Sequence, residues 1–164
     1  MKERENGVTL VALAITIIVL LIVAGIAVYQ GASIVQSSKL QSLKTNLLLI
    51  QAKVQIYAEQ ANFAGNNDGL KGSVLTAEKV LGGTVLPANE EKVRSLSKQD
   101  LTDMGLDSID EEDGDFIADY RDNEVYYVEG YQTKKDQDGN QNTYYKASEI
   151  VQLTSEDTAL AGAE

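Results

Sequence analysis

The side chains whose types and spacing could do chemistry in this sequence are the carboxylates of two acidic runs. Residues 107–115 (DSIDEEDGD) hold six carboxylates within nine residues, and residues 136–140 (DQDGN) hold two more. Hard oxygen ligands at this density suit Ca²⁺. The candidate calcium ligands are Asp107, Asp110, Asp113, Asp115, Asp136 and Asp138.

Each acidic run also has a simpler interpretation, which we adopt. The first run is typical of a solvated loop. The second is similar to the start of a calcium loop, but its glycine comes too early for an EF-hand and no carboxylate stands at position 12 of such a loop. Asp138 and Gly139 are instead a pair typical of a hairpin turn. We therefore expect no bound metal and no cofactor.

Other kinds of catalytic site lack their residues. The chain has no cysteine and no histidine, which excludes disulfides, thiolate nucleophiles, ordinary zinc sites and histidine-based acid/base pairs. The sequence also contains no nucleotide-binding loop and no recognisable catalytic triad. We therefore expect a protein that is not an enzyme.

The charge is distributed unevenly along the chain. The net charge of −11 divides into 0 for residues 1–7, +2 for residues 8–62 and −13 for residues 63–164. An acidic domain repels phosphate backbones, so binding of nucleic acid through a broad basic surface is disfavoured. A length of 164 residues allows one globular head and one helical element.

The helical element begins with a long apolar run. Residues 8–29 (VTLVALAITIIVLLIVAGIAVY) carry no charge over 22 residues. As a helix this run is about 33 Å long, enough to cross a hydrocarbon core of about 30 Å. A secretory signal peptide has a shorter apolar stretch followed by a small-residue cleavage site, and a plain signal anchor needs only the run itself. Both remain alternatives.

The residues before the run favour a third interpretation. A short polar leader (MKEREN) ends in Gly7, and the sequence that follows, G-V-T-L-V, resembles the opening of type IV prepilins. The stretch GVTLVALAITIIVLLIVAGI is particularly similar to pilin-like proteins of Gram-positive bacteria such as clostridia. The resemblance covers residues 1 to about 30. It implies that a prepilin peptidase cuts between Gly7 and Val8 and that the new amino terminus, Val8, is N-methylated. Glycine, without a Cβ, permits the close backbone approach that a protease cleft needs.

One position departs from the pattern of that family. Pilins usually carry Glu as the fifth residue after the cut, where it pairs with the amino terminus of a neighbour, but here the position is Ala12, and the first carboxylate after Val8 is Glu59. A charge buried among helices is costly unless it is paired. Either packing alone sets the register of the subunits, or the chain is a minor or tip subunit.

Beyond the run, residues 30–62 continue as an amphipathic helix. Apolar residues recur every three or four positions and form one stripe, made of Leu40, Leu43, Leu47, Ile50, Val54, Tyr57 and Ala61. No proline precedes Pro87, so we expect one helix over residues 9–62, about 80 Å long. The stripe predicts packing against the chain's own sheet; the alternative is a coiled-coil seam.

Residues 63–153 form the predicted head. Turn formers at 65–72 end the long helix, and we expect short helices at 73–81 and 98–104, the second capped by Ser97 or Asp100, with a connection at 82–87. Residues 116–120, 125–133 and 143–153 are rich in β-branched and aromatic residues and predict a three-stranded antiparallel meander. Residues 154–164 read as a flexible tail.

The head holds six of the eight tyrosines within its predicted sheet, at positions 120, 126, 127, 131, 144 and 145. Cross-strand aromatic pairs of this kind stabilise small sheets. A stacked aromatic face for a sugar or another subunit is the alternative.

Together these features predict an α+β, type IV pilin-like fold. The long helix would have a transmembrane half and an amphipathic half packed on a small C-terminal antiparallel sheet. The implied function is that of a structural subunit, a single-pass prepilin of the cytoplasmic membrane that later joins a filament on the cell surface. The implied partners are the membrane, identical or related pilins, prepilin peptidase and the pilus assembly machinery. The alternatives are a minor or tip pilin, a pseudopilin of a secretion or DNA-uptake system, and a membrane-anchored carbohydrate-binding domain.

Overall fold

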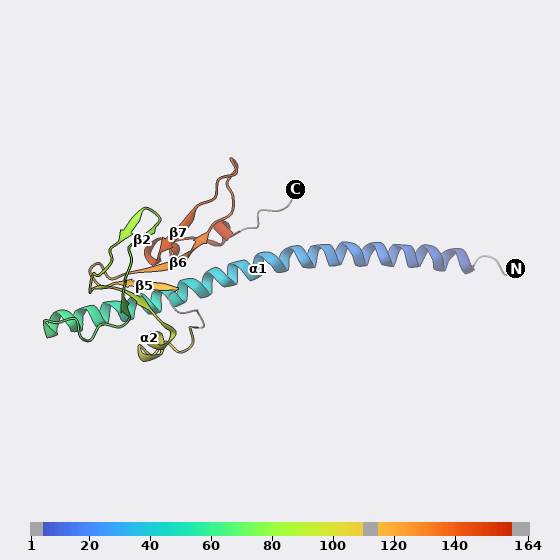
Figure 1. Cartoon of the computed structure of the whole chain (residues 1–164). Helices are drawn as coiled ribbons and strands as arrows, with labels where there is room; N and C mark the ends of the chain where they lie inside the picture. The colour runs from blue at the N-terminus through green and yellow to red at the C-terminus, as the bar shows by residue number, and fades with distance from the viewer. Residues whose placement is uncertain (1–4, 110–114, 159–164) are drawn as a thin grey trace.

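A computed structural model describes residues 5–109 and 115–158 of the chain, without the side chains of residues 5–12, 19 and 21–35. The fold is α+β, as the sequence predicts, with one long helix laid against a small antiparallel sheet (Figure 1). The elements are α1 (Glu5–Ala64), β1 (Ser73–Val74), β2 (Lys79–Leu81), β3 (Thr84–Leu86), β4 (Val93–Leu96), α2 (Lys98–Asp103), β5 (Phe116–Asp119), β6 (Glu124–Gln132), β7 (Thr143–Lys146), α3 (Ala147–Ile150) and the 3-10 turn η1 (Ser155–Thr158).

Helix α1 runs without interruption for 60 residues, which corresponds to about 90 Å. It ends at Ala64 because Gly65 adopts a left-handed conformation, with φ of 71°. The amide groups of Gly65 and Asn66 donate to the carbonyl of Ala61, at 2.9 and 3.3 Å, and so satisfy a carbonyl of the last turn. The predicted stop at residues 65–72 is therefore confirmed.

The main sheet has five antiparallel strands in the order β1-β4-β5-β6-β7. Alternation along its central strands divides the side chains between two faces. Phe116 and Ala118 of β5, with Val125 of β6, join the cluster of buried side chains packed on α1. Ile117 and Tyr126 point to the opposite face and join a second cluster.

A two-stranded hairpin, β2 with β3, covers the face of the sheet that points away from α1. Leu81 and Leu86 of the hairpin are buried and pack in the same cluster as Ile117 and Tyr126 of the sheet. The head therefore has three layers, which are helix, sheet and hairpin. Because both faces of the sheet are covered at β5, the consecutive residues Phe116, Ile117 and Ala118 are all apolar and buried.

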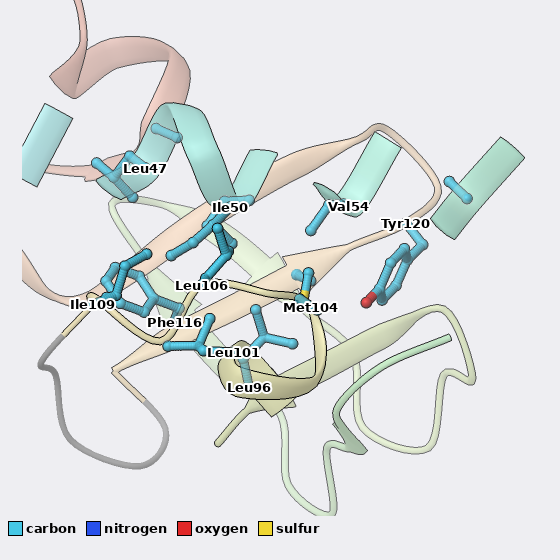
Figure 2. Close-up of a cluster of buried hydrophobic side chains, with 14 of the residues drawn as sticks. Leu47, Ile50, Val54, Leu96, Leu101, Met104, Leu106, Ile109, Phe116 and Tyr120 are labelled. Carbon is cyan, nitrogen blue, oxygen red and sulfur yellow. The ribbon is translucent and has the colours of Figure 1, made fainter. Parts of the chain in front are cut away.

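The segment from α2 to residue 109 closes the cluster between α1 and the sheet. Figure 2 shows Leu101, Leu106 and Ile109 near Phe116, and Met104 next to Tyr120, with the side chains of α1 above them. The helix prediction at 98–104 is confirmed as α2, and Ser97 is its N-cap. The Ser97 hydroxyl accepts from the Asp100 amide at 3.1 Å while the Asp100 carboxylate accepts from the Ser97 amide at 2.9 Å.

Other predictions for the head are wrong. Residues 73–81 form strands β1 and β2 rather than a helix, and the predicted connection at 82–87 contains β3, so that Gly82 and Gly83 form the tip of a hairpin. The sheet has five strands rather than three, because β1 and β4 add to β5 on the side opposite β6. Short strands of two to four residues show too little alternation to be recognised from sequence.

The C-terminal part of the head also differs from the prediction. The third predicted strand, at 143–153, stops at Lys146, and the chain continues as helix α3. Residues 155–158 of the predicted tail form η1, which packs on α1, and the Lys134 amide donates to the Asp157 carbonyl at 2.8 Å. The tail prediction at 154–164 is therefore wrong for residues 154–158, and residues 159–164 lie outside the described part of the chain.

Candidate functional site

The C-terminal half of α1 buries the predicted apolar stripe against the head. Leu47, Ile50 and Val54 are fully buried, Leu40 and Ala61 nearly so, and the stripe belongs to one cluster with the sheet, α2 and α3 (Figure 2). The prediction that this stripe packs on the chain's own sheet is confirmed. A coiled-coil seam on the same stripe is excluded because the head already occupies it.

Polar contacts also hold the head on this half of the helix. The Lys44 ammonium donates to the carbonyl of Leu153, and the Gln51 side-chain amide donates to the carbonyl of Asn123 at 3.2 Å. These contacts lie on two separate segments, after α3 and in the β5–β6 turn. Residues 40–61 of α1 and the head therefore form one packed unit.

The N-terminal half of α1 projects away from the head (Figure 1). Its described side chains are solvent-exposed, with Leu13 at 61%, Leu20 at 67%, and Ile15, Ile17 and Ile18 between 50% and 56%. No helix long and apolar enough to cross a membrane is found among the residues that the structure describes. Most side chains of the predicted span at residues 8–29 lie outside that part. The span stays a prediction, and the exposed apolar side chains lack a covering element within the described chain.

The predicted processing site lies at the start of the same helix. Gly7 and Val8 belong to the first turns of α1, which begins at Glu5, and the side chains of Val8 and Ala12 lie outside the described residues. A peptide bond in a helix must unwind before a protease can cut it, and terminal turns are the ones that fray. Cleavage after Gly7 and the role of Ala12 stay predictions.

A second set of apolar side chains lies on the face of α1 opposite the head. Leu48, Leu49, Ile56 and Phe63 are between 44% and 97% exposed, and at 100° per residue they fall roughly half a turn from the buried stripe. Scattered exposed leucines are ordinary, but apolar residues that line up along one face mark an interaction surface. The sequence contains this signal, because apolar residues in 45–63 fall on two faces rather than one.

A groove lies between α1 and strand β6 where the helix leaves the head. Its volume is about 330 Å³, and its lining residues are Lys39, Ser42, Leu43, Tyr127, Gly130 and Tyr131. The pairing of β6 with β7 shifts between Tyr126 and Tyr131. Burial, and to a smaller extent the charge of Asp157, raises the pKa of Tyr131, so its hydroxyl stays a neutral donor.

Gly130 shapes the groove through its backbone. Its φ is +72°, and a Cβ there would lie 2.6 Å from Cγ2 of Thr143 and 2.7 Å from the ring of Tyr145. Only glycine combines this conformation with so close an approach. Sequence reasoning missed the groove, although an isolated glycine inside a strand pattern is a recognised sign of a bulge.

The first group of calcium candidates is only partly within the described chain. Asp107 is exposed and Asp115 is half-buried, whereas Asp110 and Asp113 lie outside the described residues. Over residues 5–109 and 115–158, no group of three Asp, Glu, His or Cys side chains is placed to hold a metal ion. The structure brings no calcium ligands together in the part of this run that it describes.

The second group forms a turn. The Asp136 carboxylate accepts from the amides of Asp138 at 2.9 Å and Asn140 at 2.8 Å, and Gly139 has φ of +80°. The Gly139 amide donates to the Asp136 carbonyl at 3.1 Å. This carboxylate is used by the turn itself, so the prediction of a turn at Asp138 and Gly139 is confirmed.

The six sheet tyrosines lie in the two clusters, and two of them, Tyr127 and Tyr131, also line the groove beside β6. Tyr120 and Tyr126 are buried and the other four are half-buried. The Tyr120 hydroxyl donates to the carbonyl of Lys71 at 2.9 Å, and the rings of Phe116 and Tyr127 are 5.7 Å apart. These contacts agree with the interpretation that the tyrosines pack the sheet.

Comparison of the chain with protein-family models, curated proteins and solved structures finds no match. The candidate functional surfaces therefore follow from geometry. They are the projecting half of α1, the outward face of its packed half, and the groove beside β6.

Proposed function

We propose that this chain is a structural subunit of a type IV pilus or pilus-like surface filament, cut after Gly7 and assembled through the N-terminal half of α1. The observation that carries the proposal is the contrast between the two halves of one continuous helix. The second half is covered by the chain's own head, whereas the described apolar side chains of the first half are exposed.

The physical reason for assembly through this half is that apolar side chains are unfavourable in water and are stabilised by transfer to an apolar environment. Burying one Leu or Ile side chain fully contributes about 1.5–3 kcal/mol, and Leu13, Ile15, Ile17, Ile18 and Leu20 alone are each half exposed or more. A lipid bilayer or a bundle of like helices provides such an environment. Since lipid tails are as apolar as leucine, transfer from membrane to filament depends on helix packing.

The sequence around Gly7 connects this shape to processing. The G-V-T-L-V opening resembles that of type IV prepilins, and the charged side chains of the leader, Lys2, Glu3, Arg4 and Glu5, all precede the cut. Removal of the leader leaves an amino-terminal half with no charged side chain before Lys39. Such a helix can lie in the centre of a bundle without leaving an unpaired charged side chain there.

Ala12 gives specific support to a second candidate within the same family. A subunit without a carboxylate at this position cannot pair through it with the amino terminus of a neighbour. A minor or tip subunit of a short fibre, including a secretion pseudopilus, has fewer such pairings to make. An abundant product that forms long filaments on its own excludes this candidate.

The proposal is tested with a leader variant and a matched control. In the producing cells, Gly7→Leu places a side chain where a protease cleft needs none, whereas Asn6→Ala changes the neighbouring residue and leaves the glycine. We expect Gly7→Leu to stay in the membrane at full length and to vanish from the sheared surface fraction, with Asn6→Ala unaffected. Uncut Gly7→Leu chains in sheared filaments would contradict the proposal.

A further inference from the structure

The last turn of α1 presents an aromatic side chain to solvent. Phe63 is 97% exposed, and the end of the helix protrudes past the sheet (Figure 1). This end is braced, because the Arg94 guanidinium donates to the carbonyls of Leu70 at 3.0 Å and Gly72 at 3.3 Å in the loop that follows the helix. These bonds fix the position of the helix end, which carries Phe63, relative to the sheet.

The groove beside β6 has the size and lining to receive such a side chain. An apolar cavity of about 150 Å³ is enough to hold benzene, and the groove measures about 330 Å³. Its lining includes the aromatic rings of Tyr127 and Tyr131 and the apolar side chain of Leu43. The Lys39 ammonium at the rim can lie over an inserted ring as a cation–π partner.

Each feature has charges of both signs nearby, since Lys92 donates to Asn62 beside Phe63 and Glu129 accepts from the Tyr127 hydroxyl at the groove. Glu59 lies one helical turn before Phe63 and is exposed, and Lys39 is exposed at the groove. Insertion of the ring therefore brings a carboxylate of one copy near an ammonium of the other. In a chain of net charge −11, copies repel one another in general, so a contact that pairs opposite charges favours one register.

We propose that Phe63 of one copy of this chain inserts into the groove of a second copy, lined by Lys39, Tyr127 and Tyr131. Leu43 and Phe63 are 20 residues apart on one straight helix, about 30 Å, so a chain cannot fill its own groove. The two surfaces are different patches of one molecule, which makes the contact head-to-tail, and it is open-ended when the rotation between successive copies does not close a ring. This inference rests on the proposed function, because it assumes that the copies point in the same direction, as subunits of one filament do.

The absence of cysteine makes a cross-linking test unambiguous. Ser42→Cys at the groove and Ala64→Cys beside Phe63 both change exposed residues and keep the aromatic side chains. Intact cells carrying the double variant are treated with a short bismaleimide, and surface and membrane fractions are analysed by mass. We expect a ladder of dimers, trimers and larger species, and each single variant should give much less.

Two further substitutions in the double-cysteine background identify the contact. Phe63→Ala should reduce the ladder by about tenfold, as truncation of an interface anchor does. Ile56→Ala removes another exposed apolar side chain of the same outward face, about two turns before Phe63, and should leave the ladder intact because the inference inserts Phe63 alone into the groove. Tyrosine circular dichroism of each variant shows that the head is folded.

Four outcomes overturn the inference or separate it from the proposed function. Dimers without larger species indicate a closed two-fold contact and overturn the head-to-tail arrangement. Loss of the ladder with Ile56→Ala but not with Phe63→Ala assigns the contact to the middle of the outward face of α1 rather than to its Phe63 end, and overturns the inference. Filaments that begin at Val8 but give no ladder overturn this inference and leave the proposed function standing. A ladder formed by uncut chains supports the contact and contradicts the proposed function.

Discussion

Substitution of two isoleucines on α1, one on each face, distinguishes the buried face of the helix from its exposed face. Ile50 is fully buried beneath the sheet, whereas Ile56 is 47% exposed on the opposite face. Ile50→Ala removes three buried carbon groups, about 2.5 kcal/mol at about 0.8 kcal/mol each, and leaves a cavity that adds to the loss. We expect a total of about 3–4 kcal/mol, within the range of about 2–5 kcal/mol known for such changes.

Ile56→Ala is the matched control, because residue type, helix and replacement are the same. About half of its side chain is already in water, so it loses roughly 1 kcal/mol of burial and creates no enclosed cavity. The higher helix propensity of alanine offsets a few tenths of a kcal/mol in both variants. The difference between the two variants should therefore be about 2–3 kcal/mol.

The assay is urea unfolding of the full chain in a nonionic detergent, followed by tyrosine fluorescence. The chain has no tryptophan, and six of its eight tyrosines lie in the head's sheet region, so the signal reports the head rather than a helix held by the micelle. The reasoning is refuted if both variants lower the free energy of unfolding equally. That result would mean that the head does not pack on the stripe that contains Ile50.

The structure gives three further predictions. Burial raises the pKa of Tyr120 to about 12. The free energy of unfolding that this group contributes is present below about pH 10 and should fall by about 3 kcal/mol as pH rises through 12. Tyr120→Phe should reduce this alkaline loss in urea melts recorded at several pH values. Gly130→Ala should destabilise the head by about 2–3 kcal/mol, because the added Cβ would lie 2.6 Å from Thr143. Gly139→Ala is the control and should cost less, because φ at Gly139 is also positive but a Cβ there has nothing within 4 Å. Equal losses of stability would refute the close approach at Gly130. Hydrogen bonds from the Thr154 backbone amide and hydroxyl lower the pKa of Asp157. The stability that this carboxylate contributes is therefore present above about pH 4 and is lost as pH falls through the lowered pKa of the folded state. Asp157→Asn should show a smaller acid-induced loss of stability in urea melts.

The long helix could be predicted from sequence because its signal extends over many turns. A stripe at spacings of three and four from Leu40 to Ala61 has only one helical interpretation, and the turn formers after Ala64 end it. The sequence narrowed the cap of α2 to Ser97 or Asp100, and the structure uses both, because Ser97 is the N-cap and Asp100 completes a capping box. In each case local chemistry and tertiary packing favour the same structure.

The hairpin and the groove could not be predicted because tertiary contacts determine them. Strands β2 and β3 have three residues each. A strand this short shows too few alternating apolar and polar residues to be distinguished from a helix by its sequence pattern. The groove depends on a register shift in β6 at Gly130 and on where α1 leaves the sheet. The sequence places Phe63 off the buried stripe, but how far the end of the helix extends beyond the sheet depends on tertiary packing.

The most direct test of the central claim is the mass of the amino-terminal peptide from filaments sheared off the producing cells. The proposed function predicts a peptide that begins at Val8 and carries one added methyl group. An intact Met1 terminus, found only in the membrane fraction and never in a polymer, would contradict it and favour a membrane-anchored binding domain.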